Sequence, residues 1–538
     1  MIDRVFGRCL ARGRMACLAL LAFPLFQPAI AASRPNILLI VADDVGFSDL
    51  GCYGGEINTP HLDSLAAEGL RFTNYYVNNM CWPTRASLLT GLYPETALPR
   101  KGSASGGLHP TVTSLPEALG GAGYTTLMSG KWHLSNAADP DGPNAPHHRG
   151  FDHFYGTIHG ASDFFAPVDL QLDGKDMTHE WRGNPNYYYT DAITDHALSF
   201  LKDARSKQVP ESPFFLYLAY TAAHWPLHAK PEDTAKYRDR YSMGWDELRN
   251  RRHTRMKAMG LVPSSWERSP RHPSVLAWSS EENKEWQERR MEVYAAQLTS
   301  MDENIGRVIQ YLKDSGAFEN TLILFQNDNG GCHVEYDTNR TGSWTRPLTT
   351  DGKNLPIQPG NIPGLMPGPQ TTFQSYGYGW ANASNTPFRL FKQHDHEGGT
   401  RSPLIVSWPR KIKAERGGDL VSSLSHAIDM MPSLVEAAEV VGFKQSTYPF
   451  EGRSFLSGIL GTPSDKKDRP PIFWAHSKGK AVRKGQWKLV AVGKGEWELY
   501  NLEIDGTEMH NLADDLPDRV SELAALHADW AERTNLAR

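Results

Sequence analysis

The sequence predicts an α/β protein with a large, mostly parallel central sheet flanked by helices, followed by a small antiparallel sheet with a packed helix. Three apolar runs indicate the parallel sheet, at residues 36–42, 213–219 and 321–325. They lack the alternation of half-exposed strands, which is typical of parallel strands buried on both faces. Helical patterns separate them, as in sheets built from βα units. After about residue 445, four short strand-like segments with Gly-Lys turns predict an antiparallel meander.

The helices are predicted from apolar spacing and from end signals. Residues 60–69 end at a glycine, and a helix after Thr113-Ser114 begins at a hydroxyl cap. Residues 291–316 repeat apolar side chains every three or four positions. Further predictions are a helical excursion over 229–290, one long loop over 334–380, a helix over 423–440 and a final amphipathic helix that carries Leu523 and Trp530.

Composition indicates a folded enzyme with many structured loops. The 538 residues carry a formal net charge of −5, with no block of like charge, so no nucleic-acid partner is expected. The 47 Gly, 36 Pro and 15 Trp favour a deep site built from loops rather than a helical scaffold.

The first residues have the pattern of a secretory signal peptide. Arginines between Arg4 and Arg14 precede a short apolar run, and Ala29-Ile30-Ala31 offers a small-x-small cleavage site. No later apolar run is long enough for a membrane span. We therefore expect residues 1–31 to be removed, no membrane span, and a secreted or periplasmic protein.

Export affects how the cysteines are interpreted. Cys9 and Cys17 would leave with the signal peptide, so Cys52, Cys81 and Cys332 remain. Cys52 and Cys332 could pair in an oxidising compartment, but two buried thiols are the preferred interpretation.

Acidic and amide side chains follow two of the buried strands. Asp43-Asp44 and Asp328-Asn329 each stand at the end of a predicted apolar strand, where open α/β sheets place their ligand sites. Their hard oxygen donors suit Ca²⁺, or Mg²⁺, better than zinc. The competing interpretation is a set of unrelated surface acids.

The stretch Cys81-Trp82-Pro83-Thr84-Arg85, followed by Leu89-Thr90-Gly91, places a cysteine before a helix-compatible proline. Cys81 would lie at a helix N-terminus, which favours an anion, and Arg85 would add a positive charge one turn on. The competing interpretation is a buried structural cysteine.

These motifs resemble type I sulfatases of the alkaline phosphatase-like superfamily, and look most like bacterial arylsulfatases. The resemblance covers almost the whole chain after the signal peptide and includes 130–133 (Gly-Lys-Trp-His), 224–227 (His-Trp-Pro-Leu) and 397–399 (Glu-Gly-Gly). With the change of pattern after about residue 445, we expect a catalytic domain over 32–445 and a smaller subdomain over 446–538. The sequence departs from the family's frequent R-G-x-K at Arg389-Leu390-Phe391-Lys392.

The resemblance also implies the roles of individual residues. Cys81 matches the precursor of formylglycine (3-oxoalanine), whose hydrate attacks the sulfur of a sulfate ester with Ca²⁺ assistance and later eliminates sulfate. Arg85 and His133 match the pair that handles the hydrate, and His224 matches the proton donor. Lys131 and Lys392 match sulfate-binding lysines, and the metal ligands would be Asp43, Asp44, Asp328 and Asn329 together with residue 81. Other histidines, His147 and His148 among them, are expected to be structural.

The function expected is therefore a sulfuric ester hydrolase that acts on an aryl or carbohydrate sulfate, with a formylglycine-generating or sulfatase-maturing enzyme as a partner. Two alternatives stay open. One is a formylglycine-dependent phosphomonoester, phosphodiester or phosphonate hydrolase of the same superfamily. The other is a secreted glycan-binding protein whose Cys81 is never modified.

Overall fold

The computed structural model describes residues 34–98, 107–135, 141–206, 212–339, 344–443, 448–462, 469–476 and 479–534. The predicted signal peptide over 1–31 lies outside the described residues. Among the described residues, no helix combines the length and the apolar character that a membrane crossing requires. Cys52 and Cys332 are free, buried thiols, as the preferred interpretation of the sequence expected, and Cys81 is buried as well.

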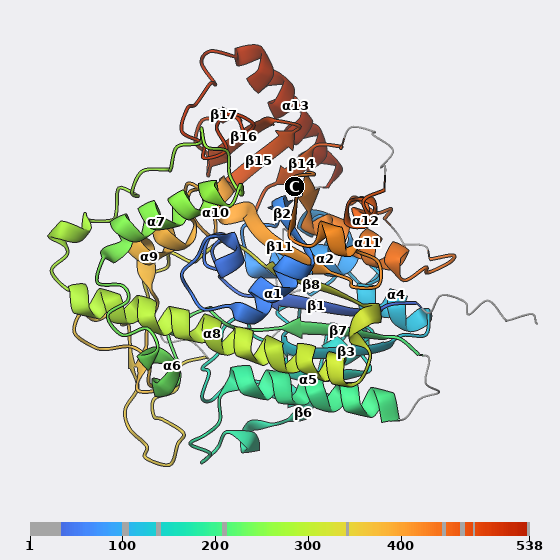
Figure 1. Cartoon of the computed structure of the whole chain (residues 1–538), viewed down its shortest axis with the longest axis vertical. Coiled ribbons are helices and arrows are strands. Elements are labelled where there is room, and N and C mark those ends of the chain that lie inside the picture. The colour runs from blue at the N-terminus through green and yellow to red at the C-terminus, as the bar shows by residue number, and fades with distance from the viewer. Residues whose placement is uncertain are drawn as a thin grey trace, which may run out of the picture. The chain divides into compact units, whose positions relative to one another are not determined.

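An eleven-stranded sheet organises the described residues (Figure 1). Its middle strands β8 (Thr321–Asn327), β1 (Asn36–Ala42), β7 (Phe214–Ala219) and β3 (Thr125–Lys131) are neighbours and run parallel. On the β3 side follow β4 (His153–Thr157), β5 (Leu170–Leu172) and β6 (Lys175–Asp176). On the β8 side follow β11 (Arg401–Ser407), which is antiparallel, then β2 (Leu70–Tyr76) with β12 (Asp419–Val421) and β13 (Ser425–His426) beside it. The predicted mostly parallel sheet is confirmed.

The central strands are buried on both faces, as their unbroken apolar runs predicted. Leu38 and Ile40 of β1 belong to one hydrophobic core, and Ile37 and Leu39 to the other. The first core is closed by α1 (Pro60–Glu68), α5 (Tyr189–Ser206), α7 (Gly244–Ala258) and α8 (Lys284–Asp314). The second is closed by α2 (Cys81–Thr90), α4 (Leu115–Gly121) and α11 (Met430–Ala437). The capping box of Ser114 and Glu117 opens α4 as expected.

Several predicted boundaries were wrong. The segment 423–440 is not one helix: it starts with β13, and the helical part begins at Ala427, because His426 and Asp429 form a capping box that ends the strand there. Helix α8 begins at Lys284 rather than at residue 291, since Trp286 is buried and its ring N–H donates to the Leu365 carbonyl at 3.0 Å. The loop over 334–380 is interrupted by short elements: β9 (Gln358–Pro359), β10 (Thr372–Phe373) and the start of α9 (Gly377–Ser384).

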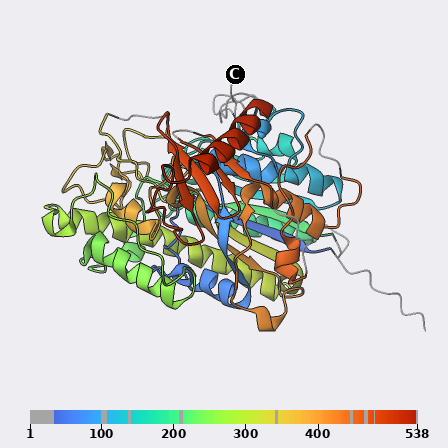
Figure 2. The same ribbon diagram turned by 90° about the horizontal axis from the view of Figure 1, so that it is seen from above.

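The C-terminal part forms the predicted antiparallel meander (Figure 2). Its strands are β14 (Ile472–Trp474), β15 (Gly479–Lys484), β16 (Trp487–Val492) and β17 (Glu498–Asn501). Helix α13 (Pro517–Arg533) packs on this sheet, with Leu523 and Trp530 buried in its core. The remaining helices are short: α3 (Pro94–Ala97), α6 (Pro231–Ala235), α10 (Glu397–Thr400) and α12 (Leu456–Leu460).

A buried ionic group joins this sheet to the rest of the chain. Lys488 of β16 lies 2.8 Å from a Glu397 carboxylate oxygen and 3.0 Å from one of Glu508, and all three side chains are fully buried. Glu397 also accepts from Tyr76 of β2 (2.6 Å) and from Arg401 of β11 (3.1 Å). Burial alone would raise the pKa of Glu397, but Lys488 and the two nearby arginines outweigh it and lower that pKa to about 2.

We expect Lys488→Met to destabilise the protein by about 3–5 kcal/mol, because the substitution removes the lysine that two buried carboxylates share. The sign of the pH effect follows from the lowered pKa of Glu397. Its stabilising contribution is present above the ordinary carboxyl pKa and disappears as pH falls towards about 2. Denaturant unfolding between pH 7 and pH 3 measures both effects. A variant as stable as the wild type, with the same acid sensitivity, would contradict this assignment.

Candidate active site

The carboxyl ends of four adjacent parallel strands deliver the predicted site residues. Asp43-Asp44 follow β1, and Asp328-Asn329 follow the neighbouring β8, with Ala42 in register with Asn327. Lys131 ends β3 and precedes His133, while His224 lies just after β7. Because parallel strands end at the same edge of the sheet, residues far apart in sequence meet there.

Helix α2 brings Cys81 to the same edge. Cys81 is its first residue, no side chain caps this end, and Gly91 closes the helix at a left-handed φ of 70°. The uncapped N–H groups of the first turn favour an anion. The Cys81 sulfur lies 3.4 Å from Nδ1 of His133. Burial raises the pKa of the Cys81 thiol, which disfavours the thiolate and makes the unmodified residue a poor nucleophile.

Three cations are each bound to one of the acids. Lys131 pairs with Asp43, and Lys392 pairs with Asp44. Arg85, fully buried in α2, donates from Nη2 to Asp328 at 2.7 Å. Arg85 also donates to the Lys131 carbonyl at 2.8 Å, so it links α2 to the end of β3. The site therefore holds a compact set of fixed positive and negative charges.

The surroundings shift the pKa values of the three carboxyl groups in different directions. Burial alone would raise the pKa of Asp43, but Lys131 outweighs it with help from His224 and Arg85, and the pKa falls below its ordinary value. For Asp44, Lys392 and His224 likewise overcome burial and lower the pKa. Burial and the neighbouring Asp43 charge raise the pKa of Asp328 to about 6. The neighbouring carboxylates therefore oppose the ionisation of Asp328 even though Arg85 is paired with it.

The oxygens of these acids show where a cation fits. Within the described part of the chain, one buried oxygen of each expected ligand has no hydrogen-bond partner: Asp43 Oδ1, Asp44 Oδ2, Asp328 Oδ1 and Asn329 Oδ1. Leaving one such atom unpaired costs about 1–3 kcal/mol, and here four gather at one edge. Ligand atoms of Asp43, Cys81 and Asp328 lie within 4.8 Å of one another. The donor set fits a hard divalent cation such as Ca²⁺.

The two histidines differ in their surroundings. Nδ1 of His224 lies 2.7 Å from the Trp225 carbonyl, which can only accept, so Nδ1 carries the proton and Nε2 faces Asp44 at 3.4 Å. Burial lowers the pKa of His224 to about 4 and the pKa of His133 well below its ordinary range. In both cases the negative charge of Asp43 acts in the opposite direction and raises the pKa. His133 is left-handed, with φ 58°, as is Asp44 with φ 60°. Such strain in residues other than glycine concentrates at functional sites.

The absence of a side chain at Gly160 makes room for the His133 ring. A Cβ on Gly160 would stand 2.2 Å from Cε1 and 2.4 Å from Nε2 of that ring. We expect Gly160→Ala to lower kcat/KM for a sulfate ester by about 100-fold, because a small misplacement of a catalytic group has effects of this size. Steady-state kinetics measures this. Gly121→Ala is the matched control, since a Cβ there meets nothing within 4 Å, and equal activity of both variants would contradict the role given to Gly160.

A pocket of about 390 Å³ opens over these groups. It is lined by Cys81, His133, His224 and Lys392 and, beyond the predicted residues, by three tryptophans: Trp82, Trp225 and Trp344. Trp82 and Trp225 stand next to predicted residues, so the motifs gave a signal for them. Trp344 lies in the long loop, and nothing in the sequence singled it out. The structure thus brings all ten predicted residues to one place and adds an aromatic wall.

The comparisons with known proteins agree with this geometry. Residues 35–440 match the family described as Sulfatase, and residues 388–529 match the family described as N-sulphoglucosamine sulphohydrolase, C-terminal. An uncharacterized sulfatase of Schizosaccharomyces pombe is 34% identical over 544 residues, covering 93% of each chain. An arylsulfatase of Klebsiella aerogenes is 30% identical over 443 residues, covering 77% of this chain and 88% of its own.

Solved structures share the fold. The crystal structure of Ps i-CgsB in complex with k-i-k-neocarrahexaose is 26% identical, with a TM-score of 0.65 and 93% of each chain covered. A phosphonate monoester hydrolase of Agrobacterium radiobacter shares the fold at 20% identity, with a TM-score of 0.54, covering 93% of this chain and 94% of its own. The site and the fold together define a hydrolase of the alkaline phosphatase-like superfamily. The chain belongs to the sulfatase family and is a sulfuric ester hydrolase.

Proposed function

We propose that Cys81 is converted to formylglycine and that the mature protein hydrolyses sulfate monoesters with a Ca²⁺ ion held by Asp43, Asp44, Asp328 and Asn329. The observation that carries the proposal is the group of four unpaired buried oxygens beside the N-terminus of α2, where Cys81 stands. Mg²⁺ suits the same donors if the site is more rigid. The ion would neutralise negative charge on the sulfate oxygens.

The modified residue would supply chemistry that a thiol cannot: one hydroxyl of its hydrate takes the SO₃ group, and the other later expels sulfate and restores the aldehyde. Lys131 and Lys392 bind the sulfate oxygens and offset the charge that spreads over them as the S–O ester bond breaks. His133, in contact with residue 81, accepts the proton of the remaining hydroxyl as sulfate leaves. Arg85 holds the Asp328 carboxylate in position by donating a hydrogen bond to it.

His224 gives the leaving oxygen its proton. The Trp225 carbonyl holds the Nδ1 proton, so Nε2 faces the site and must first take up a proton beside Asp44 before it can pass that proton to the leaving oxygen. We expect His224→Ala to lower kcat by about 10²–10⁴-fold for an alkyl sulfate, the usual range for a lost general acid, and much less for an aryl sulfate, whose phenoxide needs less help. Parallel kinetics on the two esters checks this. Equal losses on both would show that His224 acts in another way.

The proposal also covers the signal peptide, the localisation, the maturing enzyme and the domain boundaries. The N-terminal charge pattern supports a signal peptide over 1–31 and a secreted or periplasmic protein. A formylglycine-generating or sulfatase-maturing enzyme would act on Cys81. We place the catalytic domain over 32–445 and the smaller subdomain over 446–538.

The substrate is an aryl or carbohydrate sulfate. Relatives are named arylsulfatase and N-acetylgalactosamine-6-sulfatase, and one structural neighbour was solved with k-i-k-neocarrahexaose. The tryptophan-lined pocket supports a ligand with a flat face, because an aryl ring or the apolar face of a sugar stacks on indole.

Hydrolysis of an aryl sulfate and the matching aryl phosphate by the mature protein tests the reaction class. We expect a clear preference for the sulfate. A preference for phosphate would favour the phosphoester or phosphonate hydrolase alternative. Binding of sulfated glycan without turnover of either ester would favour the glycan-binding alternative.

A further inference from the structure

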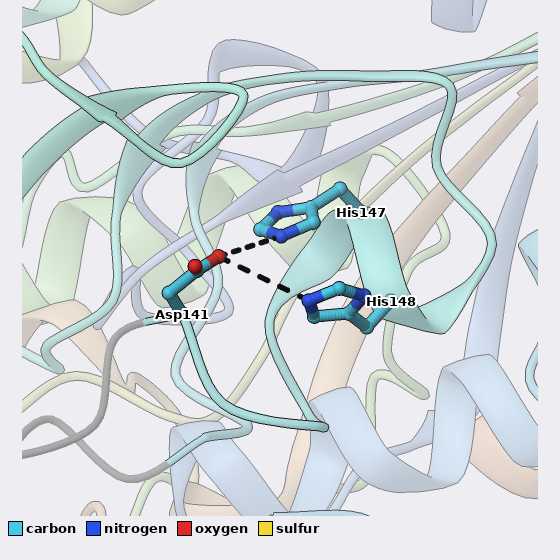
Figure 3. A group of neighbouring side chains, drawn as sticks. All are labelled: Asp141, His147 and His148. Atoms are coloured by element: carbon cyan, nitrogen blue, oxygen red, sulfur yellow. Dashed lines mark ion pairs between the residues drawn. The ribbon is translucent and has the colours of Figure 1, made fainter.

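A second group of metal-ligand side chains lies outside the active-site pocket (Figure 3). Asp141 precedes a short 3₁₀ helix, Pro146–Arg149, which carries His147 and His148. Nε2 of His147 lies 2.8 Å from Oδ1 of Asp141, and Nε2 of His148 lies 3.9 Å from the same oxygen. The figure shows both rings turned towards this one carboxylate. One ligand atom from each residue lies within 4.8 Å of the other two.

We propose that Asp141, His147 and His148 bind a divalent zinc ion. The donors are two imidazole nitrogens and one carboxylate oxygen, the set that zinc prefers and Ca²⁺ does not. The active site offers mainly hard oxygens, so the two sites would select different metals. This inference concerns a separate site and does not depend on the proposed function of the pocket.

Two adjacent histidines rarely face the same atom without a reason, because consecutive residues of a helical turn point in different directions. Here the turn is tight and ends at Gly150, which is left-handed with φ 93°. The ring centroids of His147 and His148 are 4.2 Å apart, with a tilt of 53°. The tilted rings bring both Nε2 atoms towards one point instead of stacking face to face.

The group is open to solvent on one side. Gly174, with φ 79°, stands opposite: a Cβ there would lie 3.2 Å from Oδ1 of Asp141 and 3.4 Å from Cε1 of His147. The absence of a side chain at Gly174 keeps that side of the carboxylate open. Asp141 is 69% exposed and His148 is 52% exposed, so an ion enters from solvent and water completes the coordination.

Zinc here would fix the segment that packs beside the active site. The ring N–H of Trp132 donates to the Asn144 carbonyl at 2.8 Å, and Arg149 donates to the Asn144 side chain at 3.0 Å. Trp132 stands between the proposed sulfate-binding Lys131 and His133. An ion that ties Asp141 to the 3₁₀ helix would therefore stabilise the support of Trp132.

Isothermal titration with Zn²⁺ tests the site, using the mature protein with excess Ca²⁺ to occupy the active site. We expect one zinc ion per chain in the wild type. His148→Ala and Asp141→Asn should each weaken that event by at least about tenfold, since losing even an outer-shell partner of a metal ligand has this effect.

The matched control is His153→Ala. His153 pairs with Asp173 at 3.1 Å, and its ring stacks on Phe200. The control should bind zinc as the wild type does, and thermal melting in Ca²⁺ alone should show that all the variants fold. The proposal would be overturned if the wild type bound no zinc while Ca²⁺ occupies the active site. Equal zinc binding by the wild type and the His147→Ala/His148→Ala double variant would also overturn it.

Discussion

Replacing Cys81 by serine is expected to abolish turnover of sulfate esters, with kcat lower by on the order of 10⁴-fold or more. A serine hydroxyl at the N-terminus of α2 could still take SO₃, because the lysines and the cation site remain. It has no second hydroxyl to expel the sulfate. The variant should therefore release at most one equivalent of phenol from an aryl sulfate and then stop.

Rapid-mix kinetics with an aryl sulfate measures that single release, and the mass of the intact protein should then show one added SO₃ group. Cys52→Ser is the control, because Cys52 is also a buried thiol but does not line the active-site pocket. Sustained turnover by the Cys81→Ser variant would mean that residue 81 is not the nucleophile.

Asp44→Asn is expected to lower kcat/KM by about 10²–10³-fold, the range for loss of a preorganised charge in an active site. Asp44 accepts from Asn329 at 2.7 Å, pairs with Lys392 and faces His224, so one substitution weakens the cation site, a sulfate-binding lysine and the proton donor. Asparagine tolerates the left-handed φ of 60° at this position. The fold should therefore persist.

Chelation separates the metal from the other effects of this substitution. Treating the wild type with a chelator should remove most activity, and Ca²⁺ should restore it, whereas the Asp44→Asn variant should need a higher Ca²⁺ concentration. Asp195→Asn, on the exposed side of α5 where Asp195 pairs with Arg307, should behave as the wild type. A variant that keeps full activity and Ca²⁺ dependence would remove Asp44 from the cation site.

The sequence allowed much of the sheet and the metal edge to be predicted, for one physical reason. A strand buried on both faces is mostly apolar, so the polar residues that follow its apolar run stand at the sheet edge, as Asp43 and Asp328 do. Strands β2 and β11 escaped prediction because Arg71 and Asn74 interrupt the apolar pattern of β2, and β11 begins with Arg401 and two further residues that are not typical of a buried strand. Those polar side chains find partners instead: Arg401, for example, binds Glu397 and the Thr73 carbonyl.

Contacts made by loops were less predictable. Lys392 was identified only through the resemblance, since it lies between two left-handed residues, Leu390 (φ 61°) and Gln393 (φ 76°), in a segment without periodicity. The wall formed by Trp344 depends on how the long loop folds back over the pocket. Such placement depends on contacts between distant segments, which local patterns do not encode.

Mass spectrometry of the peptide that contains residue 81, from protein made in its native host, tests the central claim most directly. The account predicts an aldehyde at this position, present as its hydrate or as a hydrazone after trapping with a hydrazine reagent. An intact thiol at residue 81 in protein that still hydrolyses sulfate esters would contradict it.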